Sequence, residues 1–189
     1  METFENDNYK LEIDIDCDPT NPREEFDNLS EMVCFHKRYN LGDDHEYNHN
    51  DYNGWDEMEK AIEKNEDPAI LWPVYLMDHS GISISTAPFG CPWDSGQVGF
   101  VFVSKEKIRK EYSVKRVTKK LMEKVKDLIL GEVKTYDQYL TGDVYSYNLL
   151  NKRTNEEDRC SGFYGSDIKQ NGILDYIGTD VASSLMLLN

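Results

Sequence analysis

The alternation of apolar and polar side chains predicts strands in the first half of the chain. Residues 9–16 alternate in this way, which is typical of a half-buried strand whose outward face carries Lys10, Glu12, Asp14 and Asp16. Residues 70–86 predict a hairpin with a tight turn at 78–81, and residues 97–103 predict another strand. The apolar run 32–36 is too short for its pattern to distinguish a strand from a helical turn.

Helical spacing follows in the middle of the chain. Ser104 is a suitable N-cap for a helix over 105–111, and a longer helix that begins at 113 or 114 is expected to stop at Gly131. The apolar stripe of the longer helix is predicted to consist of Val117, Leu121, Val125 and Leu128. These segments predict two consecutive central helices.

The remaining segments complete the fold prediction. Residues 56–64 favour a short helix, residues 144–150 a strand and residues 151–159 a polar turn. The apolar tail 173–188 has the spacing of a C-terminal helix that docks on the core. Because strands and helices do not alternate regularly, we expect a single α+β domain over residues 1–189, built on a mainly antiparallel sheet.

Negative charge is concentrated in the first third of the chain. The chain has a net charge of −15, and residues 1–67, with 21 acidic and 6 basic side chains, account for all of it. Concentrated carboxylates destabilise a fold by self-repulsion, yet they steer it toward a positive partner and can imitate the phosphates of a nucleic acid. The alternative, which composition alone favours, is an ordinary acidic protein whose charges are merely solvated.

Residues 104–130 have the opposite charge. Lys and Arg side chains crowd both central helices there. Such a face can contact nucleic-acid phosphates, and the candidates for this role are Lys115, Arg116, Lys119 and Lys120. The interpretation we favour on sequence grounds is a solvated helix face that pairs internally with the acidic segment.

Histidine and cysteine spacing provides no strong catalytic or metal-binding motif. His45 and His49 have a spacing that zinc sites use, but no Cys lies near them in the sequence and Asn, Gly and Tyr surround them. His79, Cys91 and Asp94 can in principle form a Cys/His/Asp set, as can many combinations in a chain with several Cys and His. We therefore predict no catalytic residue, no metal and no cofactor.

The cysteines and the opening residues predict a cytoplasmic location. The four cysteines are far apart and include no CxxC pair, which is typical of free thiols in a reducing compartment. Cys34 lies between Val33 and Phe35 and is expected to be a buried, unreactive thiol. The opening METFENDNYK lacks the apolar core of a signal peptide, and no apolar run approaches the length of a membrane span.

Four groups of sequence words resemble those of a small-protein family from phages, plasmids and other mobile elements. The words are DNL with MVCFH and RYNLGD (27–43), DHSGI with ST (78–86), CPWDSGQVG (91–99) and TYDQYLTGDVY (135–145). The chain is similar to families carried as counter-defence genes and resembles a type II-A anti-CRISPR protein. That resemblance implies a non-enzymatic inhibitor in the bacterial host cytoplasm that binds Cas9 with its guide RNA and blocks DNA recognition or cleavage. It supplies no catalytic motif.

An acidic, aromatic-rich protein suits the positively charged channels in which Cas9 holds nucleic acids. The residues predicted to bind this partner are Asp14, Asp16, Glu24, Glu25, Asp43, Asp44, Trp93, Asp94, Tyr136 and Asp137. Direct contact with DNA is left open. One alternative is a small hydrolase or nucleic-acid-modifying enzyme that uses His79, Cys91 and Asp94, and another is a DNA-binding accessory protein that acts through the basic helices.

Overall fold

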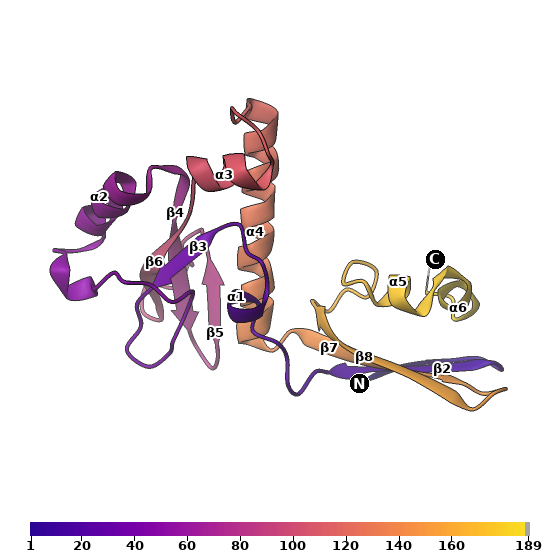
Figure 1. Cartoon of the computed structure of the whole chain (residues 1–189). Helices are drawn as coiled ribbons and strands as arrows, with labels where there is room; N and C mark the ends of the chain where they lie inside the picture. Colours follow the sequence, from indigo (N-terminus) through magenta and orange to yellow (C-terminus); the bar gives the residue numbers. More distant parts are fainter. Residues whose placement is uncertain (188–189) are drawn as a thin grey trace. The chain divides into compact units, whose positions relative to one another are not determined.

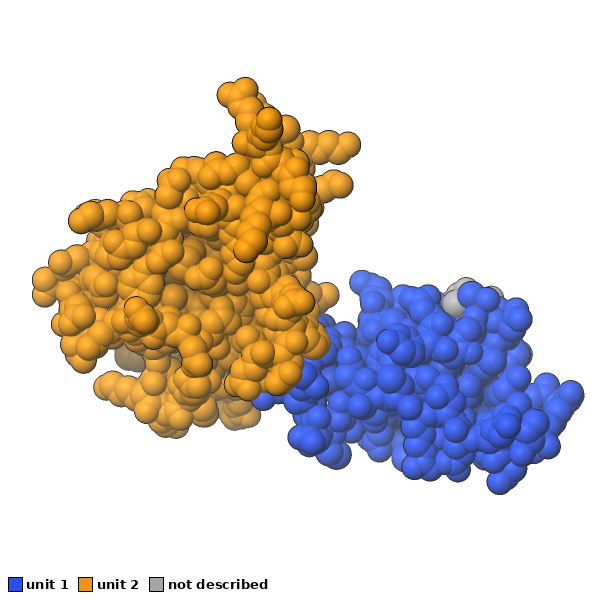
Figure 2. Space-filling view, in the orientation of Figure 1, with its two compact units in different colours: residues 1–20, 138–189 blue, residues 21–137 orange. Residues whose placement is uncertain are grey.

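The computed structural model describes residues 1–187 and divides the chain into two compact units. Unit 1 contains residues 1–20 and 138–189, and unit 2 contains residues 21–137, coloured blue and orange in Figure 2. Each unit has helices and an antiparallel sheet, so the predicted α+β class is confirmed. The sequence predicts one sheet in one domain, whereas the structure has two sheets. The difference arises because the two ends of the chain pair with each other, and local alternation carries no information about such pairing.

The sheet of unit 1 has the strand order β1-β2-β7-β8 and is antiparallel throughout. Its strands are β1 (Glu2–Glu5), β2 (Tyr9–Ile15), β7 (Val144–Asn151) and β8 (Glu156–Tyr164), of which β2, β7 and β8 are labelled in Figure 1. The predicted strands 9–16 and 144–150 are confirmed as β2 and β7. The predicted turn 151–159 is too long: residues 156–159 are polar but belong to β8, where they pair with β7. Polar residues on an exposed strand lack the alternation that would have revealed it.

Two short helices cover one face of this sheet. They are α5 (Ile173–Ile177) and α6 (Thr179–Ser184), and their apolar side chains pack with those of β2, β7 and β8 in one core. The predicted C-terminal helix 173–188 is therefore interrupted, at Gly178, which ends α5 and precedes α6. Leu188 lies outside the described residues.

The sheet of unit 2 has the strand order β3-β6-β4-β5 and is also antiparallel. Its strands are β3 (Glu31–Cys34), β4 (Pro68–Asp78), β5 (Ile82–Ser85) and β6 (Ser95–Ser104). The ambiguous run 32–36 is thus mostly strand, and the predicted hairpin 70–86 is confirmed as β4–β5. Residues 98–103 of β6 are all buried, because this strand is covered on both faces.

Helices lie on both sides of the unit 2 sheet (Figure 1). They are α1 (Pro22–Glu25), the 3-10 helix η1 (His49–Asp51), α2 (Trp55–Glu66), α3 (Lys105–Glu111) and α4 (Lys119–Thr141). Met58 and Ile62 of α2 pack against Phe100 and Phe102 of β6. The Ser104 hydroxyl accepts the backbone N–H of Lys107, which confirms the predicted cap of α3.

Helix α4 differs from its prediction at both ends. It begins at Lys119 rather than at 113 or 114, and it continues through Gly131 to Thr141. Glycine in a helix interior costs about 1 kcal/mol relative to alanine, and burial of Val133 and Tyr136 beyond it outweighs that cost. The predicted stripe is also shifted: Leu128 is 41% exposed. The buried stripe consists of Val125, Ile129, Val133 and Tyr136.

At two positions in the family words a residue larger than glycine would clash with a neighbouring backbone carbonyl. A Cβ on Gly99 would lie 1.9 Å from the carbonyl oxygen of Val33, because β6 and β3 pair there. Gly42 has a φ of +77°, and a Cβ on it would lie 2.4 Å from the carbonyl oxygen of Met32. Part of the resemblance is therefore explained by packing in unit 2.

Among residues 1–187, no helix is long and apolar enough to cross a membrane.

Candidate partner-binding surfaces

An exposed acidic surface lies on α2 and on the loop that precedes it. We define the acidic surface as seven exposed carboxylates: Asp44, Glu46, Asp51, Asp56, Glu57, Glu59 and Glu63. Within the described part of the chain, none of the seven forms an ion pair with a basic side chain. Asp56, Glu59 and Glu63 follow one another at helical spacing, opposite the buried Met58 and Ile62. Like charges at this spacing destabilise a helix by about 0.2–0.5 kcal/mol per pair, and the exposed Lys60, four residues after Asp56, offsets part of this repulsion.

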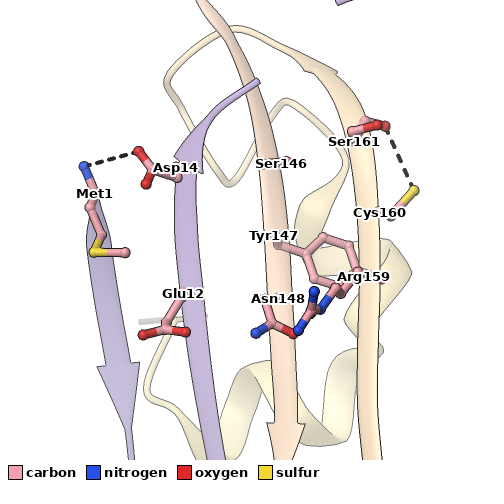
Figure 3. Close-up of a pocket in the computed structure, with 9 residues that line it drawn as sticks. All are labelled: Met1, Glu12, Asp14, Ser146, Tyr147, Asn148, Arg159, Cys160 and Ser161. Atoms are coloured by element: carbon pink, nitrogen blue, oxygen red, sulfur yellow. Dashed lines mark hydrogen bonds and ion pairs between the residues drawn. The ribbon is translucent and has the colours of Figure 1, made fainter. Parts of the chain in front are cut away.

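The carboxylates of β2 have a different environment. In Figure 3, Glu12 and Asp14 line a shallow pocket of about 420 Å³ on the sheet face that α5 and α6 leave uncovered, together with Arg159. Glu12 pairs with Lys10 at 2.6 Å, and Asp14 lies 3.6 Å from the amino group of Met1. The predicted acidic face of this strand is therefore present but locally paired with positive charge.

Asp16 and the two glutamates of α1 make local backbone and side-chain contacts. The Asp16 carboxylate accepts the backbone N–H of Asp18 and that of Gly162, both at 3.1 Å. Glu24 accepts a hydrogen bond from the Asn21 side chain, and Glu25 is exposed at the last position of α1. These residues do not belong to the acidic surface defined above.

Asp43 belongs to an internal network of unit 2. Its carboxylate accepts the Arg23 Nε–H at 2.7 Å and the backbone N–H of Met32 at 2.7 Å. The Arg23 side chain is buried, and Glu132 on α4 lies 3.8 Å from it while binding the backbone N–H groups of Leu29 and Ser30. This ion pair explains the position of Asp43 in the fold, and its contact with a partner stays a prediction.

Tyr136 and Asp137 also face the interior of unit 2. Tyr136 is 1% exposed, and its hydroxyl accepts the backbone N–H of Gly42 at 3.0 Å. Asp137 accepts the Ser83 hydroxyl and the backbone N–H of Ile84, both at 2.8 Å. A fully buried ring cannot form part of a preformed docking surface, so Tyr136 is corrected to a core residue. Asp137 anchors the β4–β5 hairpin to α4.

Trp93 and Asp94 lie on an exposed loop before β6. Trp93 is 92% exposed, which excludes the core and leaves its ring available to a partner. Asp94 Oδ2 lies 3.2 Å from His79 Nδ1 and 3.6 Å from Cys91 Sγ. The structure therefore assembles the three residues named for the hydrolase alternative. Both His79 and Cys91 contact the same carboxylate oxygen, whereas a nucleophilic triad requires contact between the thiol and the imidazole.

The basic residues between positions 105 and 124, on α3, on the start of α4 and on the segment that joins them, divide into paired and unpaired groups. Lys105 pairs with Asp67 at 2.6 Å and Lys107 with Glu31 at 3.3 Å, so internal neutralisation by the acidic segment occurs at these two positions. No ion pair within residues 1–187 involves the seven exposed basic residues Arg109, Lys110, Lys115, Arg116, Lys119, Lys120 and Lys124. The four predicted nucleic-acid contacts are all in this second group.

The histidines at 45 and 49 contact a common aromatic ring. The Phe35 ring packs against both imidazoles, with centroid distances of 4.8 Å and 5.6 Å. The described residues contain no group of three or more His, Cys, Asp or Glu side chains placed to hold a metal ion. Burial raises the pKa of the Cys34 thiol to about 12, and Cys34 is buried as predicted.

A groove that the sequence did not reveal lies between the end of β3 and the loop that follows it. We call it the motif groove, and its volume is about 820 Å³. It is lined by residues 34–41, His45, His49, Asn50, Gln97 and Val98. A smaller depression of about 310 Å³ shares His36 and Val98 with it and includes Trp93 and Asp94. The words MVCFH, RYNLGD and CPWDSGQVG all contribute to these hollows, so the words themselves were the signal that could have located them.

The family words thus have two structural roles. Asp43, Tyr136 and Asp137 hold unit 2 together through hydrogen bonds between segments far apart in the sequence. The side chains of His36, Tyr39 and other residues line the motif groove at the surface. Comparisons of the chain with protein-family models, with curated proteins and with solved structures find no match.

Proposed function

We propose that this protein is a non-enzymatic inhibitor that docks its acidic surface on the basic, nucleic-acid-binding surface of an effector protein. The effector we propose is Cas9 with its guide RNA, in keeping with the resemblance to anti-CRISPR proteins of mobile elements. The observation that carries the proposal is the set of seven exposed carboxylates without basic partners on and beside α2.

The acidic surface differs from the paired carboxylates of the fold in its excess of negative charge. Paired carboxylates, such as Asp43 with Arg23, already have their counter-charge within the fold. The seven carboxylates of the acidic surface form no ion pair within residues 1–187, and their excess negative charge raises the association rate with a cationic surface. The exposed Trp93 adds the kind of aromatic anchor on which interface binding energy concentrates.

The test compares two charge-matched variants for binding to guide-loaded Cas9. The first, Asp56→Asn/Glu59→Gln/Glu63→Gln, neutralises part of the acidic surface. The control, Glu2→Gln/Asp7→Asn/Glu156→Gln, removes the same charge from exposed positions of unit 1. We expect only the first variant to associate more slowly, by about tenfold at low salt, and with a flatter salt dependence.

Several outcomes contradict the proposal. Equal binding of both variants and the parent would exclude the acidic surface, and absence of binding by the parent would exclude Cas9. Tight binding of the parent to duplex DNA, lost in Lys115→Ala/Arg116→Ala/Lys119→Ala/Lys120→Ala, would favour the DNA-binding accessory protein instead.

One observation favours a second candidate, the hydrolase. His79 is oriented by Asp94 through a 3.2 Å contact at Nδ1, which leaves Nε2 of an exposed imidazole free to accept a proton. The absence of a Cys91–His79 contact among the described hydrogen bonds, and the openness of the cluster to water, make this candidate weaker than the inhibitor.

A further inference from the structure

The motif groove has basic and imidazole side chains in its lining and no carboxylate. Lys37, Arg38 and three histidines line it, and none of its lining residues is Asp or Glu. Arg38 is bound to Asp78, while Lys37 is exposed and has no ion pair within residues 1–187. A lining of this kind, in a chain with a net charge of −15, favours an anionic ligand.

Two histidines of the groove have their tautomers fixed by backbone contacts. His36 Nδ1 accepts the backbone N–H groups of Arg38 and Tyr39, both at 3.3 Å, so in the neutral ring Nε2 carries the proton and is a donor. His45 Nε2 lies 3.1 Å from the Cys34 carbonyl oxygen, which only accepts, so this nitrogen carries the proton. The neutral His45 ring therefore keeps Nδ1 as an acceptor.

His45 Nδ1 has no partner. It is a buried side-chain nitrogen without a hydrogen bond within the described part of the chain. Buried polar atoms in native proteins are nearly always hydrogen-bonded, and an orphaned one calls for an explanation. His45 lines the motif groove, and a groove ligand that offers an N–H or O–H donor would satisfy this shielded nitrogen after a local shift of the His45 side chain.

Aromatic faces complete the groove. The His36 and Tyr39 rings stack with centroids 4.9 Å apart and an interplanar angle of 10°, and Tyr39 is 36% exposed. Phe35 packs between His45 and His49 on the same lining. Flat, partly exposed rings of this kind bind planar heterocycles by stacking.

We propose that the motif groove binds a mononucleotide, whose base stacks on the aromatic lining and donates to His45 Nδ1 while its phosphate contacts Lys37 and the His36 Nε2–H. The volume of about 820 Å³ lies within the usual range of small-molecule sites. A longer strand is disfavoured, because Asp44, Glu46 and Asp51 alternate in sequence with the groove residues His45, His49 and Asn50 and would repel its further phosphates. The groove borders the acidic surface, to which Asp44, Glu46 and Asp51 belong, but the nucleotide proposal does not depend on the proposed inhibitor function.

The test is calorimetric titration of the full chain with the four nucleoside monophosphates, with adenosine and inorganic phosphate as separate probes, and with a ten-nucleotide single strand. We expect saturable binding of at least one monophosphate, and weaker binding by about tenfold or more of the nucleoside and of phosphate alone, since each makes half of the contacts. Tighter binding of the single strand than of every monophosphate would overturn the assignment to a free mononucleotide.

Exposed variants keep the test independent of folding. Lys37→Glu and Tyr39→Ala alter the phosphate and stacking contacts without touching the core, and each is expected to weaken binding by about tenfold. Lys64→Glu, an equal charge change on the exposed side of α2, is the control and should change affinity by about twofold or less. Unchanged affinity in both groove variants, or no saturable binding of any monophosphate by the parent, would overturn the proposal.

Discussion

Arg23 Nε donates a hydrogen bond of 2.7 Å to Asp43 Oδ1, and this contact joins α1 to the loop after β3 in unit 2. The guanidinium is buried, so its charge is separated from water and relies on Asp43 and Glu132 for compensation. The same Asp43 carboxylate also satisfies the backbone N–H of Met32. Asp43 thus compensates a buried positive charge, which the exposed carboxylates of the first third do not.

The adjacent aspartates allow a matched comparison of stability. We expect Asp43→Ala to lower the free energy of unfolding by about 3–5 kcal/mol, because it leaves a buried guanidinium without its main partner. Asp44→Ala removes an exposed, unpaired carboxylate and should change the free energy of unfolding by about 0.5 kcal/mol or less. Urea denaturation of both variants measures the difference, and equal stabilities would contradict the structural role of Asp43.

The Cys34 thiol is expected to resist alkylation in the folded protein. Its pKa rises from an ordinary 9.0 to about 12 because the thiol is buried, so the thiolate fraction near pH 8 falls about a thousandfold. Iodoacetamide at pH 8 should therefore modify the exposed Cys17 well before Cys34, as followed by mass spectrometry of the peptides. In urea the two rates should converge. Equal rates in the native protein would exclude the buried environment.

The same shift has a consequence for stability at high pH. The folded state holds the Cys34 proton more tightly than the unfolded chain does, so its contribution to stability is complete below about pH 9. That contribution is lost progressively as the pH rises from about 9 toward about 12. In this range the slope of the free energy of unfolding against pH reports about one proton bound more tightly by the folded state, and Cys34→Ser should remove that contribution.

Trp93 and Trp55 should separate binding from folding. Trp93 is almost fully exposed, so Trp93→Ala is expected to change the free energy of unfolding by about 0.5 kcal/mol or less and to weaken partner binding by about 2 kcal/mol or more. Trp55 packs edge-on against Phe100 with centroids 5.9 Å apart, and Trp55→Ala should lower the free energy of unfolding by about 2 kcal/mol or more. Thermal unfolding and a binding assay on the same preparations distinguish the two effects. Full binding by a stable Trp93→Ala protein would remove this ring from the interface.

Local patterns predicted the elements whose stabilising contacts are close in sequence. The Ser104 hydroxyl caps α3 by accepting the backbone N–H of Lys107, only three residues later. The alternation of apolar and polar residues in β2 indicates directly which of its faces is buried. The predicted end of α4 at Gly131 was wrong, because the helix continues where Tyr136 is buried against a loop almost a hundred residues earlier in the sequence. The propensity of one residue carries no information on such a contact.

The candidate site was less predictable than the fold. Charge counts placed the excess negative charge in residues 1–67, but of the carboxylates predicted to bind a partner only Asp44 belongs to the acidic surface. They could not distinguish Asp43 from Asp44, because only the folded structure shows that Asp43 pairs with the buried Arg23, twenty residues earlier. The motif groove was also hidden, since its lining comes from β3, the following loop and β6, which only the folded sheet brings together.

The cluster of His79, Asp94 and Cys91 provides the sharpest test of the non-enzymatic proposal. If the protein acts by occupancy, inhibition of Cas9 should saturate at about one protein per target and should be indifferent to EDTA and to His79→Ala. His79 is exposed and contacts Asp94 at the surface, so His79→Ala should leave the fold intact. The same imidazole would be indispensable to the hydrolase alternative, because it is the only base that Asp94 orients in this cluster. Turnover of a nucleic-acid or ester substrate at substoichiometric protein, lost in His79→Ala and retained in the exposed control Lys64→Ala, would establish the enzyme and overturn the inhibitor.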